Sequence, residues 1–403
     1  MLGKSSLNSK IPIRERDFNY SMKLSRITLS IIGLWPFREN IRCSNFKFVV
    51  ILVSILMTLL SSLTFVYQTD DDDKMFHSLI NSLYMLMTLV KLLMMRCKND
   101  KLEVILSEMR IDWRKYERFS DGNKRLVDLY TGKARTSSFV CIFFMEFSIT
   151  TYFISRVAYA LQQPAKIREW DLPYTAVYPF EVTSSLFVPM YLWQVFSAMC
   201  LGSVTISIDC LLVTTACHAT GQLAALCENI KSYGHEQRHR DETLSSEIEC
   251  SCIRCIIERH VDIVRYCRLV EDAYNLILLT EFIGTTFQFC LQMYIIVEHS
   301  HDKNIVGLLS FCIYLLVFNF RLFMYCNVFD AMVEMGEKVG ASAYDISWYD
   351  FHPEAVRQLM FCILRANKPL NVTAGKFFSL NRNSYKNVIM TSSSYASVLL
   401  SIK

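Results

Sequence analysis

The sequence lacks the short motifs on which many enzyme classes depend. Its 403 residues contain no phosphate-binding loop, no GxSxG and no GxGxxG, so there is no positive evidence for an enzyme that uses them. The net charge of +4 is too small to indicate a nucleic-acid partner. A cleavable secretory signal is also missing, because residues 1–30 mix charged and apolar side chains. We therefore expect the first long apolar run to be an uncleaved membrane anchor.

Cysteine is present, but not in the pattern of a disulfide-stabilised secreted domain. The 15 cysteines are an odd number, and they fall within apolar runs or in loops that the charge pattern assigns to the cytoplasm, so we expect free thiols. Cys250, Cys252 and Cys255 lie near His260, yet the spacing lacks a second CxxC or HxxxH half. Reduced thiols on a helix are the better interpretation, and no metal or other cofactor is predicted.

Apolar residues dominate what is present. The chain is 52% hydrophobic and 13% aromatic, and its mean hydropathy is positive, whereas soluble domains of this length usually carry more charge. A helix that crosses a hydrocarbon core of ~30 Å needs about 20 apolar residues. Seven runs reach or approach this length: residues 48–67, 75–95, 136–155, 182–208, 273–297, 304–329 and 387–402. The last run is short, and we expect it to extend backwards through Phe377, Phe378 and Leu380.

The positive charges predict how these seven spans are oriented. Lys and Arg number 30 in residues 1–45, 96–133, 218–268 and 330–376, but only five in the other loops. By the positive-inside rule the first set is cytoplasmic, which places the amino terminus inside and the carboxyl terminus outside. Segments 96–133 and 218–268 contain no proline and carry apolar residues at helical spacing, so we expect the spans to continue into the cytoplasm as helices.

The sequence therefore predicts an all-α, seven-transmembrane protein with one membrane domain. Its predicted parts are a cytoplasmic amino-terminal segment (1–45), spans 1 to 6 with cytoplasmic extensions (46–329), a cytoplasmic anchor segment (330–376) and the last span (377–403). Such a chain is a multi-pass protein in contact with membrane lipid.

A G-protein-coupled receptor is the first alternative. That class also has seven spans but the opposite orientation, and this sequence has neither a DRY triplet ending the third span nor an NPxxY in the last. Glu258, Arg259 and His260 resemble a degraded DRY, but they lie between the fourth and fifth spans, where a solvated charged helix is the simpler interpretation.

A membrane zinc metalloprotease is the second alternative. His235, Glu236 and His239 form an HExxH string, which on a helix places two imidazoles one turn apart for zinc beside a glutamate. The intervening Gln237 and Arg238 offer no apolar surface to bury, whereas a catalytic zinc helix normally forms the floor of a cleft. We interpret the string as a solvated loop.

Two acidic residues inside the predicted spans need a partner. A carboxylate at the centre of a span costs about 2.5–3.5 kcal/mol on insertion scales, so Glu146 and Glu281 must face protein or water. The spacing of the sequence does not reveal what they pair with. The acidic run from Asp70 to Asp73 follows the first span and is expected to be a solvated outer loop, with attraction of cations to a channel mouth as the alternative.

The carboxyl-terminal part carries a specific resemblance. AYDISWY at Ala343–Tyr349, LNVTAGKFFSL at Leu370–Leu380 and TSSSYASVLL at Thr391–Leu400 are similar to the terminal signature of the insect odorant receptors. The resemblance implies a subunit of a ligand-gated, non-selective cation channel in the plasma membrane of a sensory neuron. It also implies a heterotetramer with the odorant co-receptor of the same fold, cytoplasmic helices as a shared anchor, and the last span lining the pore. The shorter loop between spans 4 and 5 resembles the odorant-binding subunit rather than the co-receptor.

Candidate site residues follow from this function. A volatile odorant needs a mostly apolar and aromatic pocket between helices, for which the outer halves of spans 2, 3, 4 and 6 offer Phe76, Leu79, Leu83, Phe147, Thr150, Thr151, Ile154, Phe187, Tyr191, Gln194, Leu309 and Cys312. In the last span, spacings of three and four place Thr391, Ser394, Val398 and Ile402 on one helical face. The resemblance puts Val398 and Ile402 where the pore narrows, and a hydrophobic constriction closes a pore by dewetting. Packing of this face on the fifth span is the alternative.

Overall fold

The computed structural model describes residues 18–37, 40–162, 172–180, 184–233, 252–298 and 305–402. Within these ranges the chain consists of α-helices, two short 3-10 helices, a two-stranded hairpin and short connections. The all-α prediction is therefore confirmed. The elements are α2 (Lys23–Ile31), α3 (Ile41–Gln68), α4 (Asp72–Cys97), α5 (Asn99–Lys115), η1 (Tyr116–Arg118), α6 (Asp121–Gln162), α7 (Ser184–Lys231), α8 (Ile253–Glu298), α9 (Ile305–Tyr344), η3 (Trp348–Asp350), α10 (Pro353–Ala366), β1 (Thr373–Ala374), β2 (Phe378–Ser379) and α11 (Arg382–Ile402).

Short polar side chains begin several of these helices by satisfying backbone donors that have no partner within the helix. The Asn40 side chain accepts hydrogen bonds from the amides of Arg42 and Cys43 at the start of α3. Asp71 accepts from the amide of Lys74 at 3.2 Å and caps α4. Part of the acidic run that follows the first span is therefore a helix cap.

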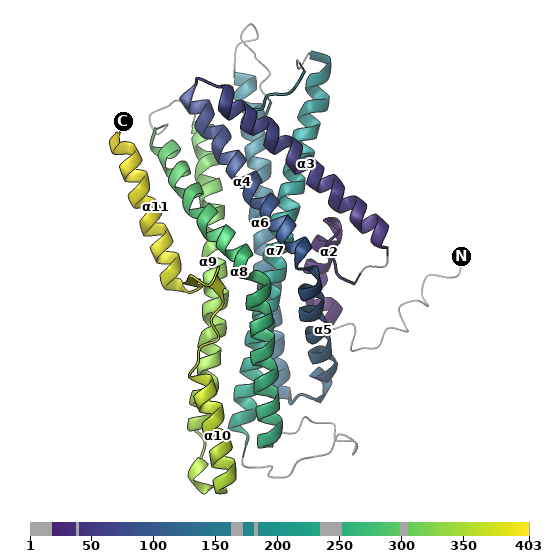
Figure 1. Cartoon of the computed structure of the whole chain (residues 1–403), viewed down its shortest axis with the longest axis vertical. Coiled ribbons are helices and arrows are strands. Elements are labelled where there is room, and N and C mark those ends of the chain that lie inside the picture. The colour runs from purple at the N-terminus through teal and green to yellow at the C-terminus, as the bar shows by residue number, and fades with distance from the viewer. Residues whose placement is uncertain are drawn as a thin grey trace, which may run out of the picture.

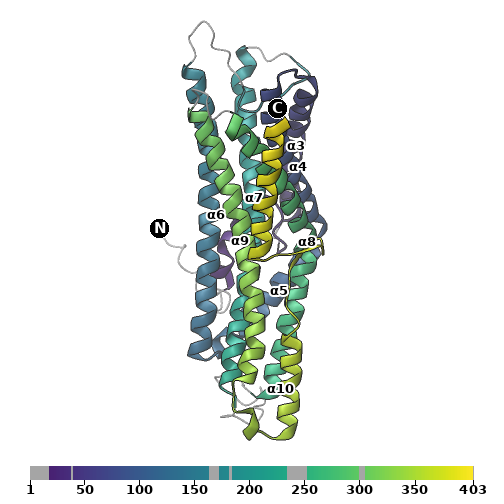
Figure 2. The same ribbon diagram turned by 90° about the vertical axis from the view of Figure 1, so that its left-hand side faces the viewer.

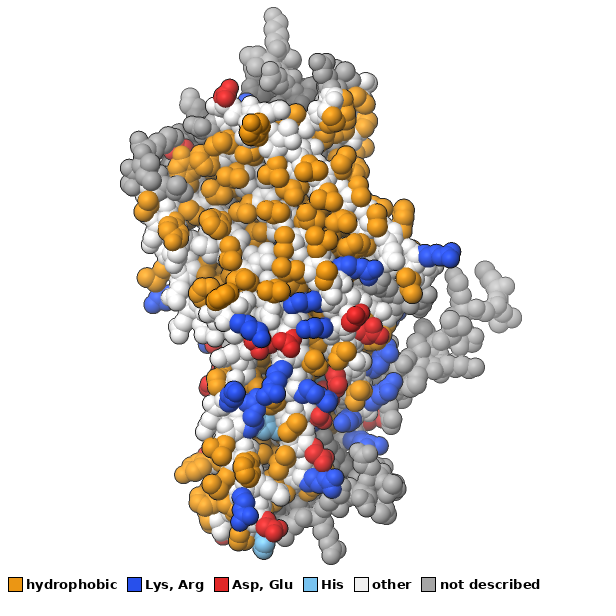
Figure 3. Space-filling view, in the orientation of Figure 1, with side chains coloured by type: hydrophobic (Ala, Val, Ile, Leu, Met, Phe, Trp, Pro, Cys, Tyr) orange, Lys and Arg blue, Asp and Glu red, His pale blue; other side chains and the backbone are white. Residues whose placement is uncertain are grey.

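The long helices divide the molecule into two halves. Figure 3 shows apolar side chains gathered over the upper half and Lys, Arg, Asp and Glu side chains over the lower half. We call these the apolar half and the charged half. In the described ranges six helices are long and apolar enough to cross a membrane, namely α3, α4, α6, α7, α8 and α9. The seventh, α11, is 21 residues long and runs along the apolar half (Figure 2).

Burial distinguishes a central helix from a peripheral one. In the most apolar window of each helix, 78% of α7 is buried inside the chain but only 33% of α3. Figure 1 shows α3 crossing the outside of the bundle at a steep tilt, and α7 passing through its middle. Because α7 contacts α3, α4, α6, α8 and α9, it is the helix around which these spans are arranged.

The charged half is built from the continuations of α6, α7, α8 and α9 together with α5 and α10 (Figure 1). The prediction that spans continue as helices is correct for α6, α7 and α8. The second span instead ends at Cys97, and α5 starts a new helix at Asn99. The sixth span continues as well, to Tyr344, which the sequence did not predict.

An ion cluster ties α5 to α7 and α8 in the charged half. The Asp112 carboxylate accepts from Arg259 at 2.7 Å and contacts Nε2 of His218 at 3.0 Å. Burial alone would raise the pKa of Asp112, but the Arg259 and His218 charges and hydrogen bonds outweigh it and hold that pKa well below its usual range. The Arg259 side chain is only 11% exposed. The expectation that this stretch of helix is solvated is therefore wrong at Arg259 and at the buried His260, and it holds at the exposed Glu258.

The LNVTAGKFFSL segment forms a hairpin rather than helix. Thr373 pairs with Ser379 and Ala374 with Phe378, so the expected backward extension of the last helix through Phe377, Phe378 and Leu380 is wrong. The turn needs positive φ at Gly375 (+59°) and Lys376 (+64°). A Cβ on Gly375 would also lie 2.6 Å from Cδ2 of Leu279, so glycine permits the close approach to α8.

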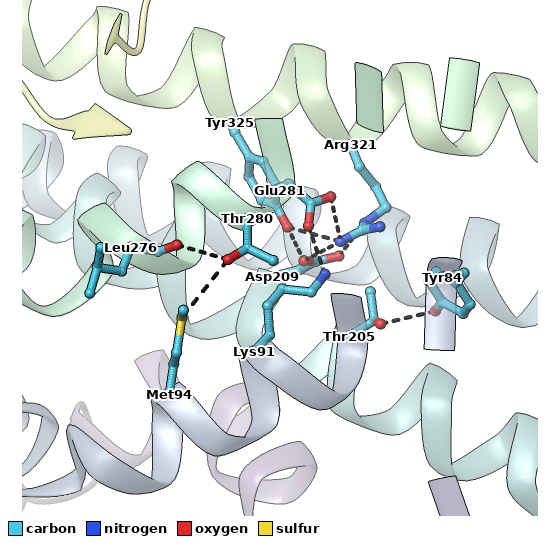
Figure 4. A network of polar contacts seen from close by, with 10 residues as sticks. All are labelled: Tyr84, Lys91, Met94, Thr205, Asp209, Leu276, Thr280, Glu281, Arg321 and Tyr325. Atoms are coloured by element: carbon cyan, nitrogen blue, oxygen red, sulfur yellow. Dashed lines mark hydrogen bonds and ion pairs between the residues drawn. The ribbon is translucent and has the colours of Figure 1, made fainter. Parts of the chain in front are cut away.

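Four charged side chains meet in the interior, one from each of four helices (Figure 4). The Lys91 ammonium lies 2.6 Å from Oε2 of Glu281, and Arg321 lies 3.1 Å from Oε1 of the same carboxylate. Arg321 also donates to Asp209 at 2.9 Å and 3.2 Å, and the Tyr325 hydroxyl donates to Asp209. All four charged side chains are at most 3% exposed. We call Lys91, Asp209, Glu281 and Arg321 the charge quartet.

The charge quartet is neutral as a whole, and this explains how it can be buried. A single unpaired charge at this depth is costly, but two cations and two anions within hydrogen-bonding distance compensate one another. Removal of one partner leaves an uncompensated buried charge, which costs about 3–5 kcal/mol in buried pairs. The quartet therefore fixes the relative register of α4, α7, α8 and α9, and it supplies the partner that Glu281 needs.

The quartet makes a prediction about stability. Lys91→Met leaves Glu281 and Asp209 facing only one cation, so we expect a destabilisation of about 3–5 kcal/mol and a lower thermal midpoint for the purified chain in detergent. The double variant Lys91→Met/Glu281→Gln, in which the remaining charges balance, should recover part of the loss. Lys101→Met removes the same charge from an exposed position and serves as the control. Equal midpoints for Lys91→Met and Lys101→Met would contradict this account.

Candidate functional site

A cavity of about 510 Å³ lies in the apolar half between α4, α6, α7 and α9. This volume is within the range of small-molecule sites, about 300–1,000 Å³. Aromatic side chains make up much of its wall: Tyr84, Tyr152, Phe153, Tyr174, Phe311 and Tyr314. Methionine and aliphatic side chains fill most of the remainder, with a few hydroxyl, amide and basic groups. Such a lining suits a small, mostly apolar ligand.

The cavity rests on the charge quartet. The Tyr84 ring makes edge contacts with Tyr314 and Phe318 at centroid distances of 6.2 Å and 5.6 Å. The guanidinium of Arg321 lies 5.6 Å from the centre of the Phe318 ring. The Tyr84 hydroxyl bonds to Thr205 at 2.9 Å beside the quartet (Figure 4). The ring of Tyr84, which lines the cavity, therefore contacts Phe318, and Phe318 lies against the buried guanidinium of Arg321.

A folded connection closes one side of the cavity. The Gln194 amide accepts from the Tyr174 backbone amide at 2.7 Å and donates to the Tyr174 carbonyl at 3.0 Å. The Tyr152 hydroxyl donates to the Pro173 carbonyl at 2.7 Å, and the Tyr152 and Tyr174 rings stack at 5.6 Å. The buried Gln194 thus holds the loop residue whose ring forms part of the wall.

The residues predicted to bind the ligand come from the four helices that enclose the cavity, but none of the twelve is among its lining residues. Phe147, Ile154 and Leu309 are 48%, 62% and 56% exposed on the outside of the bundle. Tyr191 lies behind the wall, with its ring 6.3 Å from that of Phe153. Gln194 acts through Tyr174. Whether any of the twelve contacts an odorant stays a prediction. Partly buried or exposed beside the cavity are Phe76, Leu79, Leu83, Thr150, Thr151, Phe187 and Cys312.

Sequence reasoning missed the polar side of the third span. Ser148, Tyr152 and Ser155 recur at spacings of four and three, and all three line the cavity. A usable signal existed, since small and polar residues in a membrane helix face protein more often than lipid. The residues predicted instead on this helix, Phe147, Thr150, Thr151 and Ile154, do not line the cavity, and Phe147 and Ile154 point outward.

The helix α11 packs on α8 and α9 with one side only. Ser392 and Ala396 are buried, and the Ser392 hydroxyl donates to the Thr286 carbonyl of α8 at 3.4 Å. Thr391, Ser394 and Val398 are exposed in the isolated chain, with Val398 at 53%. The side chain of Ile402 lies outside the described residues. The predicted pore face is thus a different side of the helix from the one that packs on the fifth span.

Of the two candidate metal sites, the HExxH string and the cysteines near His260, the structure describes only part of the second. His235, Glu236 and His239 lie outside the described residues, as does Cys250. Among the described residues no group of three His, Cys, Asp or Glu side chains has the geometry to hold a metal ion. The 14 cysteines within the described ranges are all free thiols, as expected.

The fold and the cavity define a class of protein. Several long helices cross an apolar zone, bury a neutral set of charges and enclose a small-molecule site between them. This is the architecture of a polytopic membrane protein with a small-molecule cavity.

Comparison with known proteins gives the family. A family model described as 7tm odorant receptor matches residues 73–393, and the chain belongs to this family. Odorant receptor 13a of Drosophila melanogaster is 24% identical over 243 residues, which are 57% of each protein. The odorant receptor coreceptor of Harpegnathos saltator is 26% identical over 154 residues, 38% of this chain and 32% of that protein. The matches thus span little more than half of the length of these relatives, or less.

A solved structure supports the fold independently. The insect olfactory receptor OR5 from Machilis hrabei, in complex with eugenol, superposes with a TM-score of 0.80 over 96% of this chain and 98% of that one, at 17% identity. This likeness concerns the fold. The chain is thus a multi-pass helical protein of the odorant receptor family.

The cavity predicts which aromatic residues matter most for ligand response. Phe153 lines it and Tyr191 only supports Phe153. We expect Phe153→Ala to raise the half-maximal odorant concentration about tenfold, which corresponds to about 1.4 kcal/mol, and Tyr191→Ala to raise it by less. Phe139→Ala, on the same helix but 64% exposed, is the matched control. Dose–response curves of surface-expressed variants measure the shifts. A larger effect of Tyr191→Ala than of Phe153→Ala would contradict the position of the site.

Proposed function

We propose that the chain is the odorant-binding subunit of a ligand-gated, non-selective cation channel. It binds a volatile odorant in the cavity of the apolar half and opens a pore lined in part by α11. The observation that carries this proposal is the aromatic cavity of about 510 Å³ between spans of a chain that belongs to the odorant receptor family.

The proposed orientation puts the charged half in the cytoplasm. The charged half consists of the long helical extensions, α5 and α10, and it is rich in Lys and Arg side chains (Figure 3). The positive-inside rule favours the cytoplasm for such a region. The amino terminus is then inside, the carboxyl end of α11 is outside, and the cavity lies in the outer half of the membrane. The protein resides in the plasma membrane of a sensory neuron.

The proposed partner is the odorant co-receptor in a heterotetramer. A relative at 26% identity is named a coreceptor. On the chain itself, α10 buries Leu359 and Cys362 against the bundle but exposes Met360, Phe361 and Leu364 at 56%, 66% and 63%. A contiguous exposed apolar face of this kind favours a protein contact. In the assembly α10 contributes to the cytoplasmic anchor shared by the subunits.

The proposed route from ligand to pore uses contacts already described. Tyr84 and Tyr314 line the cavity and pack on Phe318, which lies against Arg321 of the quartet. Glu281 of the quartet lies on α8, five residues before Thr286, whose carbonyl accepts from Ser392 of α11. In this proposal the rings pack differently in the closed and the open channel. A ligand that binds one packing more tightly than the other shifts the population of open channels by the difference between its two affinities.

The gate predicts a change in resting current. Because Val398 is exposed on the side of α11 away from α8, a polar substitution should favour water in a hydrophobic constriction. We expect Val398→Ser, co-expressed with the co-receptor, to raise basal current severalfold without odorant, and Ile402→Ser to do so more weakly.

The matched control is Ala396→Ser, which adds the same hydroxyl on the side of α11 that packs on α8. Co-receptor subunits contribute their own gate residues, so the leak should be partial. Wild-type basal current and ion selectivity in surface-expressed Val398→Ser and Ile402→Ser would remove α11 of this subunit from the gate.

A further inference from the structure

The formally charged side chains that line the cavity, Lys74 and Arg156, are both positive, and His77 is a further basic group. The described lining residues include no Asp or Glu. A mostly apolar wall weakens the screening of these charges compared with bulk water. A ligand in the cavity therefore meets hydrogen-bond donors and positive charge, and no carboxylate among the described residues.

Arg156 is the cation best placed to act on a ligand. It is partly buried at the end of the cavity nearest the connection to α7, and one guanidinium nitrogen donates to the Leu172 carbonyl at 3.3 Å. A guanidinium carries five N–H donors and can bind a carboxylate with two of them, so the bond to Leu172, the one that Arg156 makes within the described ranges, leaves further donors. Arg156 lies one turn after Tyr152, whose ring forms part of the same wall.

Lys74 supplies a weaker positive charge at the mouth of the cavity. Its side chain is 61% exposed and lies 3.5 Å from Asp71, which is itself 47% exposed and not among the lining residues. Exposed pairs of this kind are worth little, so the pair does not replace the effect of Arg156. We therefore assign the main electrostatic role to Arg156.

The tyrosine of the closing loop does not offset this charge. Burial raises the pKa of Tyr174 well above its ordinary value, and the nearby Tyr152 and Tyr84 raise it further, so the phenol stays neutral. His77 packs its ring against Phe311 at a centroid distance of 4.8 Å. Neither Tyr174 nor His77 therefore adds a negative charge to the aromatic wall of the cavity.

We propose that the cavity selects odorants whose polar end accepts hydrogen bonds, a carboxylate most strongly, and that it rejects protonated amines of the same carbon skeleton. The inference rests on the proposed odorant-binding function of this cavity. The apolar body of such a ligand packs among Tyr152, Phe153, Tyr174 and Phe311, and its oxygen atoms face Arg156.

The rejection of amines follows from the same charges. An ammonium group carries three donors and no acceptor, so it would leave its water shell to face Arg156 and Lys74. Burial of a charge without an opposite partner is costly. The discrimination between the acid and the amine should therefore reach at least the lower end of the effect of one methylene, about tenfold.

The test is direct binding to the purified full chain in lipid nanodiscs, measured by titration calorimetry at neutral pH. Phenylacetic acid, methyl phenylacetate and phenethylamine share one aromatic skeleton and differ at the polar end. We expect the acid to bind most tightly, the ester next, and the amine at least tenfold more weakly than the acid. An amine that binds as tightly as the acid, or an acid that does not bind at millimolar concentration, overturns the inference.

Variants separate charge from shape. Arg156→Met should weaken binding of the acid about tenfold or more and change binding of the ester by less, whereas Arg156→Lys should restore part of the preference for the acid. Arg114→Met removes the same charge from an exposed position of α5 and controls for net charge. Unchanged affinity of the acid in Arg156→Met contradicts the inference.

The two proposals fail in different ways. Calorimetry on the isolated chain does not depend on current, so binding in the expected order without any odour-evoked current would refute the channel function and leave the ligand class intact. Odour-evoked currents that prefer the amine would refute the ligand class alone.

Discussion

The structure depends on the compensation of four buried charges. Lys91, Asp209, Glu281 and Arg321 come from α4, α7, α8 and α9, and each is at most 3% exposed. In a bilayer the helices gain little from the hydrophobic effect when they associate, so polar contacts and close packing decide their arrangement. A shift of any one helix along its axis would separate a charge from its partner. The quartet therefore restricts the four helices to few packings, which is the property a receptor with two discrete states requires.

This constraint connects the two proposed functional regions. On one side of the quartet are Tyr84 and Tyr314, which line the cavity, and Phe318, on which both rings pack. On the other side, α8 continues past Glu281 to the carbonyl that accepts from Ser392 of α11. Ligand binding can then favour one arrangement of rigid helices over another without deforming any of them. The account requires no flexible element between the cavity and the pore helix.

Some of the fold could be predicted from the sequence and some could not, for physical reasons. The runs from 48–67 to 387–402 predicted the spans because length and hydropathy decide what crosses a bilayer. The hairpin at Gly375 was missed because Phe377 and Phe378 read as a continuation of an apolar helix, although Gly375 before a charged Lys376 is a turn signal. The pairing of Glu281 was unpredictable, since Lys91 and Arg321 lie on helices far apart in the sequence. The cavity lies between helices on which the ligand-binding residues were predicted, but none of the predicted residues lines it, and Phe147 and Ile154 face outward.

The central claim is that one chain supplies both the odorant site and part of the pore. It is tested most directly by recording from membrane patches excised from cells that co-express this chain and an insect odorant co-receptor, in solutions free of nucleotides. The account predicts that an odorant still evokes a cation current in the excised patch, and that patches with the co-receptor alone do not respond to that odorant. A response that occurs only in intact cells, disappears on excision and requires G-protein activity would contradict it.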